Sequence, residues 1–380
     1  MPSLLRDRPA STPEMLAVFG DEALLKAALA FEAQLALAQG ELGMIPQGDA
    51  KAIAEACAEP FDIQELADAA AHAGTLAIPL VERLRARVTP KAAAHVHKGA
   101  TSQDLADTAL MLQARDGAAL IQRDARRLAD ALATLARTHR STPMLGRTLL
   151  QAALPITFGL KVSTWLSGVA GALDRFERET AAIRLQFGGA AGSRAGLDGQ
   201  GAALAERLAQ RLGLQAALPW HAERQSLAGL GSALAILTGA VGKIASDIAL
   251  LAQVEVAEAF EPRQPGRGGS SAMAHKRNPT GCQVALSAAI RAPHLAATIV
   301  SALPQQHERG LGGWQAEAPV LAELFQLTHG ALAAMLAVIE GLEVDTARMA
   351  ANLVAAQVGA DVGESLALVD QALADYEKDR

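Results

Sequence analysis

The chain has 380 residues, of which 51% are hydrophobic, 19% are charged and only 3% are aromatic, and its formal net charge is −6. A chain this long and apolar can bury a large core, which excludes disorder, and its acidic balance argues against a nucleic-acid partner. Alanine and leucine dominate, so helix is favoured over strand. Cys57 and Cys282 lie far apart, so we expect neither a disulfide nor a structural zinc site. Residues 1–13 lack the apolar stretch of a signal peptide, which predicts a cytoplasmic protein.

The segment up to about residue 100 is expected to form several shorter helices. Glycine and proline interrupt it at Gly40, Gly43, Pro46, Pro60 and Pro79. This pattern predicts a smaller N-terminal helical domain, residues 1–102.

A polar cluster ends that domain, with His95, His97, Thr101 and Ser102 close together. Thr101 or Ser102 can cap the helix that follows, so a solvated helix start is one interpretation. The other is a cradle of hydroxyl and amide groups at the positive end of a helix, which suits a carboxylate. His95 and His97 as a metal pair lack a third ligand. The residues alone leave the first two interpretations open.

Residues 103–140 contain no proline and carry a charged face, which predicts a long helix. A second polar cluster follows at residues 146–151, ahead of a helix expected from Pro155 to about residue 186. Arg147 and Gln151 in this cluster either cap that helix or reach an anionic ligand.

The chain between Pro219 and Pro262 has no proline, and its apolar residues recur at alternating spacings of three and four. This seam predicts a helix packed along its length against other helices. Residues 225–242 carry no charge, but Lys243 and Asp247 continue the same pattern, so a soluble bundle is expected rather than a membrane span. Burying such rods predicts a homo-oligomer. The seam consists of Leu227, Leu230, Leu234, Leu237, Val241, Ile244, Ile248 and Leu251.

A third polar cluster, residues 262–279, separates two long helices. It contains three glycines, two serines, a histidine and a lysine, and Asn278-Pro279 starts the next helix. A loop this long inside a helical domain is typical of a functional segment.

Two further helices are expected, over residues 279–303, bent or broken near Pro293, and over residues 318–340, interrupted at Gly330. No segment shows sustained strand alternation. The prediction is an all-α protein with an N-terminal domain (1–102), a central long-helix bundle (103–340) and a short, reduced helical tail (341–380).

Residues 269–279 read Gly-Ser-Ser-Ala-Met-Ala-His-Lys-Arg-Asn-Pro. This resembles the signature loop of the fumarase/aspartase/argininosuccinate lyase superfamily, G-S-S-x-M-P-x-K-x-N-P, with Ala274 where proline is usual. Residues 97–102 (His-x-Gly-x-Thr-Ser) and 146–148 (Gly-Arg-Thr) resemble the other two signature segments, in the expected order. The resemblance implies a helical core shared between subunits. It also implies a homotetramer in which the three segments meet at one site from three subunits.

The same resemblance implies roles for individual residues. Ser270 handles a carbon-bound proton next to a carboxylate, and Lys276 and Asn278 stabilise the doubly charged intermediate. A serine alkoxide needs a strongly positive setting, which Lys276 and a helix N-terminus can supply. No metal and no cofactor are implied. The substrate-binding candidates are His97, Thr101, Ser102, Arg147, Thr148, Gln151, Ser271, Met273, His307 and Arg309.

Several of these candidates could equally serve structure or a contact between subunits. That alternative applies to His97, His307 and Arg309, and to His221 and Arg224, which stand outside the signature segments.

Leu149 distinguishes two branches of the superfamily. Elimination enzymes such as adenylosuccinate lyases carry histidine there, where a general acid can protonate the leaving amine. A carboxylate, with a pKa of about 4, leaves without one. With residues 219–221 and 305–317, the leucine resembles a lactone-forming branch that adds a carboxylate of a tricarboxylate substrate to an alkene. The alternatives are an adenylosuccinate lyase-like enzyme that releases fumarate and a non-catalytic helical tetramer.

Overall fold

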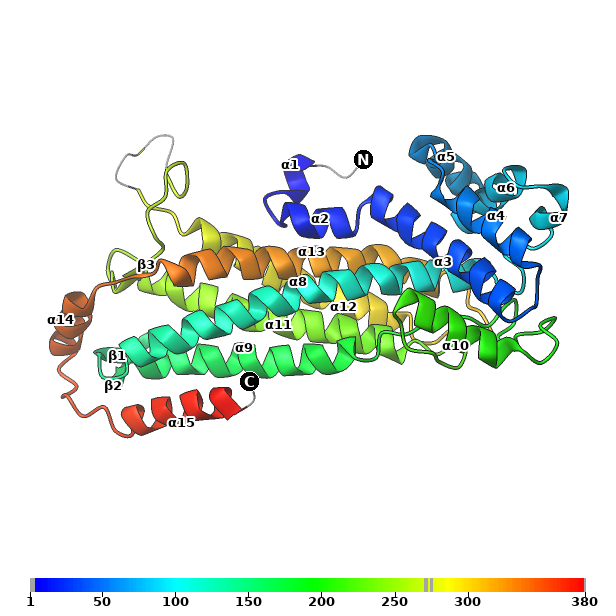
Figure 1. Ribbon diagram of the computed structural model, residues 1–380. Helices are drawn as coiled ribbons and strands as arrows, with labels where there is room; N and C mark the ends of the chain where they lie inside the picture. The colour runs from blue at the N-terminus through cyan, green and yellow to red at the C-terminus, as the bar shows by residue number, and fades with distance from the viewer. Residues whose placement is uncertain (1–3, 270–272, 274–275, 379–380) are drawn as a thin grey trace.

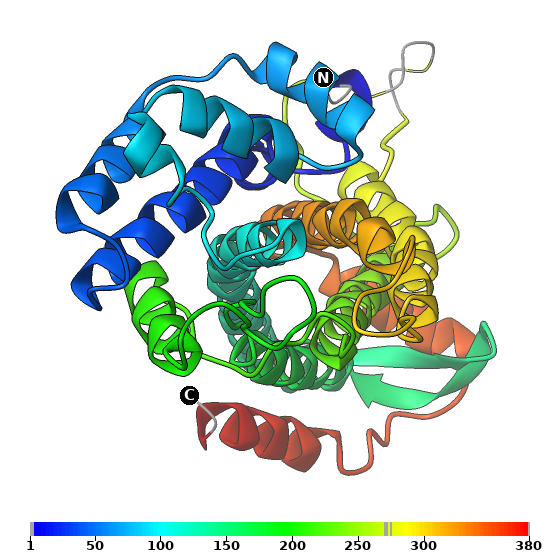
Figure 2. The ribbon, with the colours of Figure 1, turned by 90° about the vertical axis from the view of Figure 1, so that its right-hand side faces the viewer.

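The computed structural model describes residues 4–269, 273 and 276–378 (Figure 1). Five long helices run side by side and form a central bundle, which confirms the predicted all-α, long-helix fold (Figures 1 and 2). These helices are α8 (Ser102–Thr138), α9 (Phe158–Thr180), α11 (Gln225–Leu251), α12 (Thr280–Ser301) and α13 (Gly313–Glu340).

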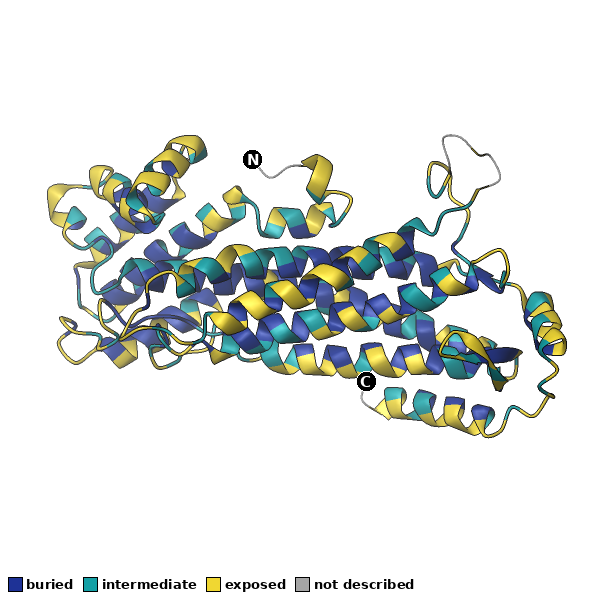
Figure 3. Ribbon diagram, turned by 180° about the vertical axis from the view of Figure 1, so that it is seen from behind, coloured by how far each residue is buried: buried dark blue, intermediate teal, exposed yellow. Residues whose placement is uncertain are grey.

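The predicted apolar seam of α11 is confirmed as part of the bundle core. Every seam residue from Leu227 to Leu251 is at most 4% exposed. Figure 3 shows the buried residues on the inward faces of the long helices and the exposed residues on the outside. By length and composition alone, α11, α12 and α13 are apolar enough to cross a membrane. In the bundle these three helices pack against one another.

Shorter helices gather beside the bundle end at which α8 begins (Figure 2). A second hydrophobic core joins them, with Phe31 and Leu84 from the N-terminal segment packed together with Leu105 of α8 and Leu208 of α10. The boundary at residue 102 stays a prediction, since α8 and α10 both contribute to this core. These helices are α3 (Asp21–Glu41), α4 (Gln47–Ala58), α5 (Ile63–Ala73), α6 (Ala77–Ala86), α7 (Pro90–Ala93) and α10 (Gly201–Leu212). The first two helices, α1 (Leu4–Asp7) and α2 (Pro13–Val18), lie beside the middle of the bundle, and Met15 of α2 belongs to the bundle core (Figure 1).

Two small antiparallel sheets depart from the strand-free prediction. β1 (Pro143–Thr148) pairs with β2 (Gln151–Thr157), and β3 (Ala259–Phe260) pairs with β4 (Glu343–Val344). The second polar cluster is therefore a hairpin, and α9 begins at Phe158 rather than Pro155. Its two-residue turn is Leu149-Leu150 instead of the Asn-Gly or Asp-Gly that such turns favour, so the sequence carried no hairpin signal.

The interruption predicted at Gly330 was wrong, and so was a break at Pro293. α13 continues through Gly330, where a Cβ would collide with the backbone oxygen of Ala10. The glycine thus serves the close approach of the N-terminal segment. α12 likewise continues through Pro293, which is exposed, and a bend at this proline stays a prediction.

The last segment of the chain lies along the outside of the bundle. α14 (Thr346–Ala356) packs against β1, and α15 (Ser365–Lys378) packs against α9 (Figure 1). The boundary at residue 340 stays a prediction.

Candidate functional site

The predicted site residues separate into two groups at opposite ends of α8. We call the end where α8 begins the N-cap end and the end where it finishes, beside β1 and β2, the hairpin end (Figure 1). The 37 residues of α8 span about 55 Å between them. The N-cap end holds His97, Thr101, Ser102, His307 and Arg309, and the hairpin end holds Arg147, Thr148, Gln151, Met273, Lys276 and Asn278. Ser270 and Ser271 lie outside the described residues.

At the N-cap end, Thr101 starts α8 and Asp104 secures that start. The Thr101 backbone N–H donates to Asp104 Oδ2 at 3.0 Å. Asp104 also accepts from the backbone N–H groups of Gly188 and Gly189, both at 2.9 Å. The Arg309 guanidinium donates to the Thr101 hydroxyl. The loop between α12 and α13 therefore meets the first signature segment here, and it brings a cation to the positive end of α8.

His97 lies in the same segment and is held by α3. Its Nδ1 is 2.6 Å from Oε1 of Glu32, whose side chain is fully buried. The backbone of His97 has φ 62°, in the left-handed region that few non-glycine residues adopt. Burial acts to lower the pKa of His97, but attraction and hydrogen bonding by Glu32 outweigh it, and the pKa is raised.

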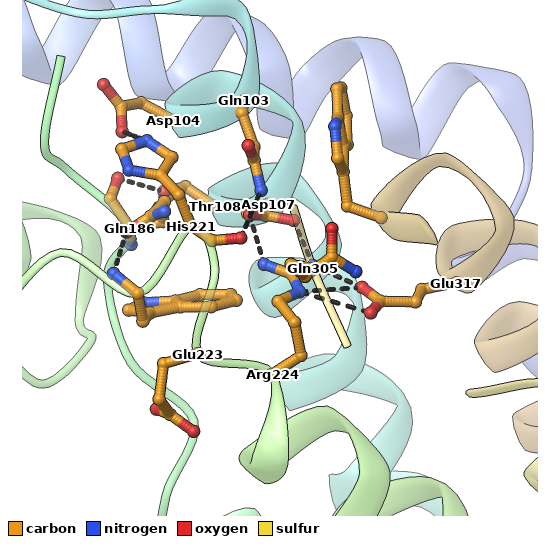
Figure 4. A network of polar contacts seen from close by, with 12 residues as sticks. Gln103, Asp104, Asp107, Thr108, Gln186, His221, Glu223, Arg224, Gln305 and Glu317 are labelled. Atoms are coloured by element: carbon orange, nitrogen blue, oxygen red, sulfur yellow. Dashed lines mark hydrogen bonds and ion pairs between the residues drawn. The ribbon is translucent and has the colours of Figure 1, made fainter. Parts of the chain in front are cut away.

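A buried polar network lies next to the start of α8 (Figure 4). Arg224, at the start of α11, donates to both carboxylate oxygens of Asp107 on α8, at 2.7 and 2.9 Å, and also to Glu317 on α13. The Arg224 side chain has no exposed surface. Gln103 donates to Asp107 at 3.1 Å and to the backbone oxygen of His221 at 3.1 Å. This network ties α8, α11 and α13 together.

The network assigns structural partners to two residues whose role the sequence left open. His221 Nε2 lies 2.8 Å from Asp104 Oδ1, and Arg224 is paired with two carboxylates. Sequence reasoning missed Asp107 and Glu317, because nothing local shows that distant carboxylates meet one arginine. Asp104 carried a weak signal, since it follows Thr101 at the spacing of a capping box.

At the hairpin end, Arg147 makes a bidentate ion pair. Its two terminal nitrogens donate to Glu258 at 2.8 Å each, and Glu258 is fully buried. Asn352 of α14 donates to the same carboxylate at 2.7 Å. Arg147 thus anchors the hairpin to the chain before β3, and its role toward substrate stays a prediction. Thr148 and Gln151 are exposed beside the turn.

The third polar cluster is fastened at its base, which we call the loop stem. The Asn278 backbone N–H donates to the Gly268 oxygen at 2.8 Å, and Glu261 accepts from the N–H groups of Gly281 and Cys282 at 3.0 and 2.8 Å. Beyond the stem, Lys276 is exposed.

A cavity of about 540 Å³ adjoins Asn278 and runs along α12. In the part of the chain that is described, no group of three or more histidine, cysteine, aspartate or glutamate side chains is arranged to hold a metal ion.

Comparison with known proteins identifies relatives over most of the chain. A family model described as lyase matches residues 8–293. The chain is 49% identical to 3-carboxy-cis,cis-muconate cycloisomerase of Bradyrhizobium diazoefficiens, over 90% of this chain and 77% of that protein. It is 43% identical to nitrosuccinate lyase of Streptomyces davaonensis, over 92% of this chain and 76% of that protein. Its fold matches the crystal structure of 3-carboxy-cis,cis-muconate lactonizing enzyme from Pseudomonas putida with a TM-score of 0.92 and 36% identity, covering 99% of each chain.

Proposed function

We propose that this chain, which belongs to the lyase family, catalyses the cyclisation of 3-carboxy-cis,cis-muconate to 4-carboxymuconolactone. This is a step of aromatic degradation through the protocatechuate branch of the β-ketoadipate pathway. The observation that carries the proposal is the similarity to cycloisomerases of this name over nine-tenths of the chain, together with the match of the whole fold.

The reaction needs a proton at carbon and stabilisation of negative charge. One carboxylate oxygen of the substrate adds to the alkene, and the carbon α to another carboxylate is protonated. Ser270 gives that proton in the lactone-forming direction, and Lys276 and Asn278 stabilise the doubly charged intermediate. The exposed position of Lys276 beyond the loop stem supports this role, because its ammonium can reach a ligand.

Leu149 fits carboxylate chemistry better than amine elimination. The internal carboxylate needs no general acid, since its pKa is about 4. Leu149 is 96% exposed at the tip of the hairpin, so an apolar side chain stands where elimination enzymes of the superfamily place histidine. This counts against the adenylosuccinate lyase-like alternative.

A homotetramer with composite sites explains the separation of the site residues. A small tricarboxylate is far too short to bridge about 55 Å, so one site needs the two bundle ends from different chains. The bundle also leaves apolar helix surface uncovered, because only 28% of the most apolar 18-residue stretch of α12 is buried. A shared helical core would cover that surface.

We extend this proposal to location. The apolar faces of α11 and α12 would be covered by other copies of the chain rather than by lipid, which supports a soluble protein. We propose the cytoplasm as its location. The charged residues Lys243 and Asp247, which form an ion pair on α11, support this reading.

The experiment that tests the function follows the ultraviolet absorbance of the conjugated diene. Purified protein with added chelator is mixed with 3-carboxy-cis,cis-muconate, and we expect the absorbance to fall as the lactone forms. Parallel reactions with adenylosuccinate and nitrosuccinate test elimination. Turnover of either compound with an unchanged diene would overturn the proposal.

A further inference from the structure

Glu32 is a buried carboxylate that the proposed chemistry does not yet use. It lies on α3, outside all three signature segments, and is 1% exposed. One carboxylate oxygen, Oε1, contacts His97 Nδ1 at 2.6 Å. The other, Oε2, is buried and has no hydrogen-bond partner among the described residues. A buried carboxylate with a single partner is costly to the fold, which points to a role beyond holding helices together.

The partner of Glu32 is itself constrained. His97 adopts φ 62°, and the next glycine, Gly99, has φ 76°, so the chain turns sharply before Thr101. Strain of this kind persists where the surroundings over-determine it, and it gathers at binding segments. The side chain of His97 is 13% exposed, so its ring is enclosed but still reachable from outside.

The charges around His97 come from three helices. Glu32 on α3 and Asp104 on α8 favour the protonated ring, and Arg85 on α6 opposes it. Of these, Glu32 alone is hydrogen bonded to the ring among the described residues. Since Nδ1 is directed to Glu32, protonation leaves the Nε2–H group as the donor available to a ligand.

We propose that Glu32 is a positioning residue for substrate binding: it fixes the His97 ring and keeps it as an imidazolium whose Nε2–H group binds a carboxylate of the substrate. This inference rests on the proposed function for the identity of the substrate. The link between Glu32 and the charge of His97 does not depend on it.

The sign of the pH effect follows from the raised pKa of His97. The ring is charged below its pKa, so carboxylate binding is lost as the pH rises through that value. Without the negative charge of Glu32 the pKa of His97 falls, and the alkaline loss of kcat/KM begins at lower pH. If Glu32 served only helix packing, its substitution would instead lower kcat/KM by the same factor at every pH.

The test measures kcat/KM of the full-length enzyme from about pH 6 to about pH 9. For Glu32→Gln we expect the alkaline limb to move to lower pH and KM near pH 8 to rise about tenfold, with a smaller change in kcat. Glu32→Asp keeps the negative charge, so its alkaline limb should lie between those of the wild type and Glu32→Gln. If Glu32→Gln does not fold, Glu32→Asp alone tests the shift. Glu22→Gln, an exposed glutamate on the same helix, is the matched control and follows the wild type. A uniform loss of activity across pH, or no change, would overturn the proposal.

A second readout separates this inference from the proposed function. Histidine-labelled protein is titrated by NMR, and His97→Gln identifies the His97 signal. Glu32→Gln should lower the pKa of that signal even if the wild type does not consume carboxymuconate, an outcome that would reject the function alone. An unchanged titration of His97 would reject the Glu32 inference alone.

Discussion

At the scale of single residues, the tip of the hairpin is unusual. Leu149 and Leu150 have φ 49° and 63°, and their side chains are 96% and 73% exposed. A left-handed conformation costs a non-glycine residue about 1–2 kcal/mol. Two strained, exposed leucines are unfavourable in an isolated chain. Burial of the tip in a site formed with another copy would offset that cost.

Leu149→His tests whether lactone formation depends on leucine at this position. We expect kcat/KM for lactone formation to fall at least tenfold, roughly the value of one good contact, and we expect no cleavage of adenylosuccinate. The measurement is initial rates with both substrates, with Leu150→His as the neighbouring control on the same turn. Fumarate release by Leu149→His with lactone formation intact would show that lactone formation does not depend on leucine at this position, against our account.

Residue partners were the least predictable part of the site. Arg147 is recognisable from its motif, but its ion pair with Glu258 joins positions 111 residues apart. Likewise Glu32 meets His97 across 65 residues. Such pairs depend on how helices pack, which the order of residues along one helix does not encode.

At the scale of elements, the loop stem holds the base of the third polar cluster. Gly268 has φ 72°, and a Cβ there would lie 2.7 Å from the backbone oxygen of Asn278. Only glycine satisfies both the conformation and the close approach. The stem therefore fixes the position of Asn278 just before α12 begins at Thr280.

Gly268→Ala should loosen this stem. We expect kcat/KM to fall about tenfold or more, because strain of about 1–2 kcal/mol and a backbone collision both act on the segment that carries Asn278. Gly269→Ala is the matched control, since that glycine has open space around it, and its loss should be several-fold smaller. Steady-state kinetics and limited proteolysis of the loop report the effect, and equal losses in the two variants would contradict the role of the stem.

Elements with a strong local pattern could be predicted from the sequence. The seam of α11 repeats over its whole length, so its burial followed from spacing. The hairpin did not follow, because its turn uses two leucines and its strands are short and interrupted by a register shift. Gly330 was misjudged because the contact it permits, with Ala10, is distant in sequence.

At the scale of the whole molecule, exposed apolar residues on α12 mark the surface that we expect other copies to cover. Ile290 is 70% exposed in the single chain although it lies on a bundle helix. Membership of the superfamily could be predicted from three short motifs, whereas the separation of these motifs by the length of α8 needed the structure.

Ile290→Asp tests the predicted assembly. A charge buried between copies costs several kcal/mol, so we expect the four-chain mass to give way to smaller species and activity to fall with it. Val354→Asp, which changes a similarly exposed residue (78%) on α14 away from the bundle, should keep the mass of the wild type. Light scattering coupled to size-exclusion chromatography gives the masses. A wild-type mass for Ile290→Asp would place the shared core elsewhere.

The most direct test of the account mixes two inactive chains. Lys276→Met damages the hairpin end and His97→Gln damages the N-cap end, and each variant alone should have little lactone-forming activity. If one site combines the two ends from different chains, randomly mixed assemblies contain intact sites at about a quarter of all positions. We therefore predict that co-expressed, doubly tagged assemblies recover about a quarter of wild-type activity. Activity no greater than that of the parent variants would contradict a site built from two ends of different chains.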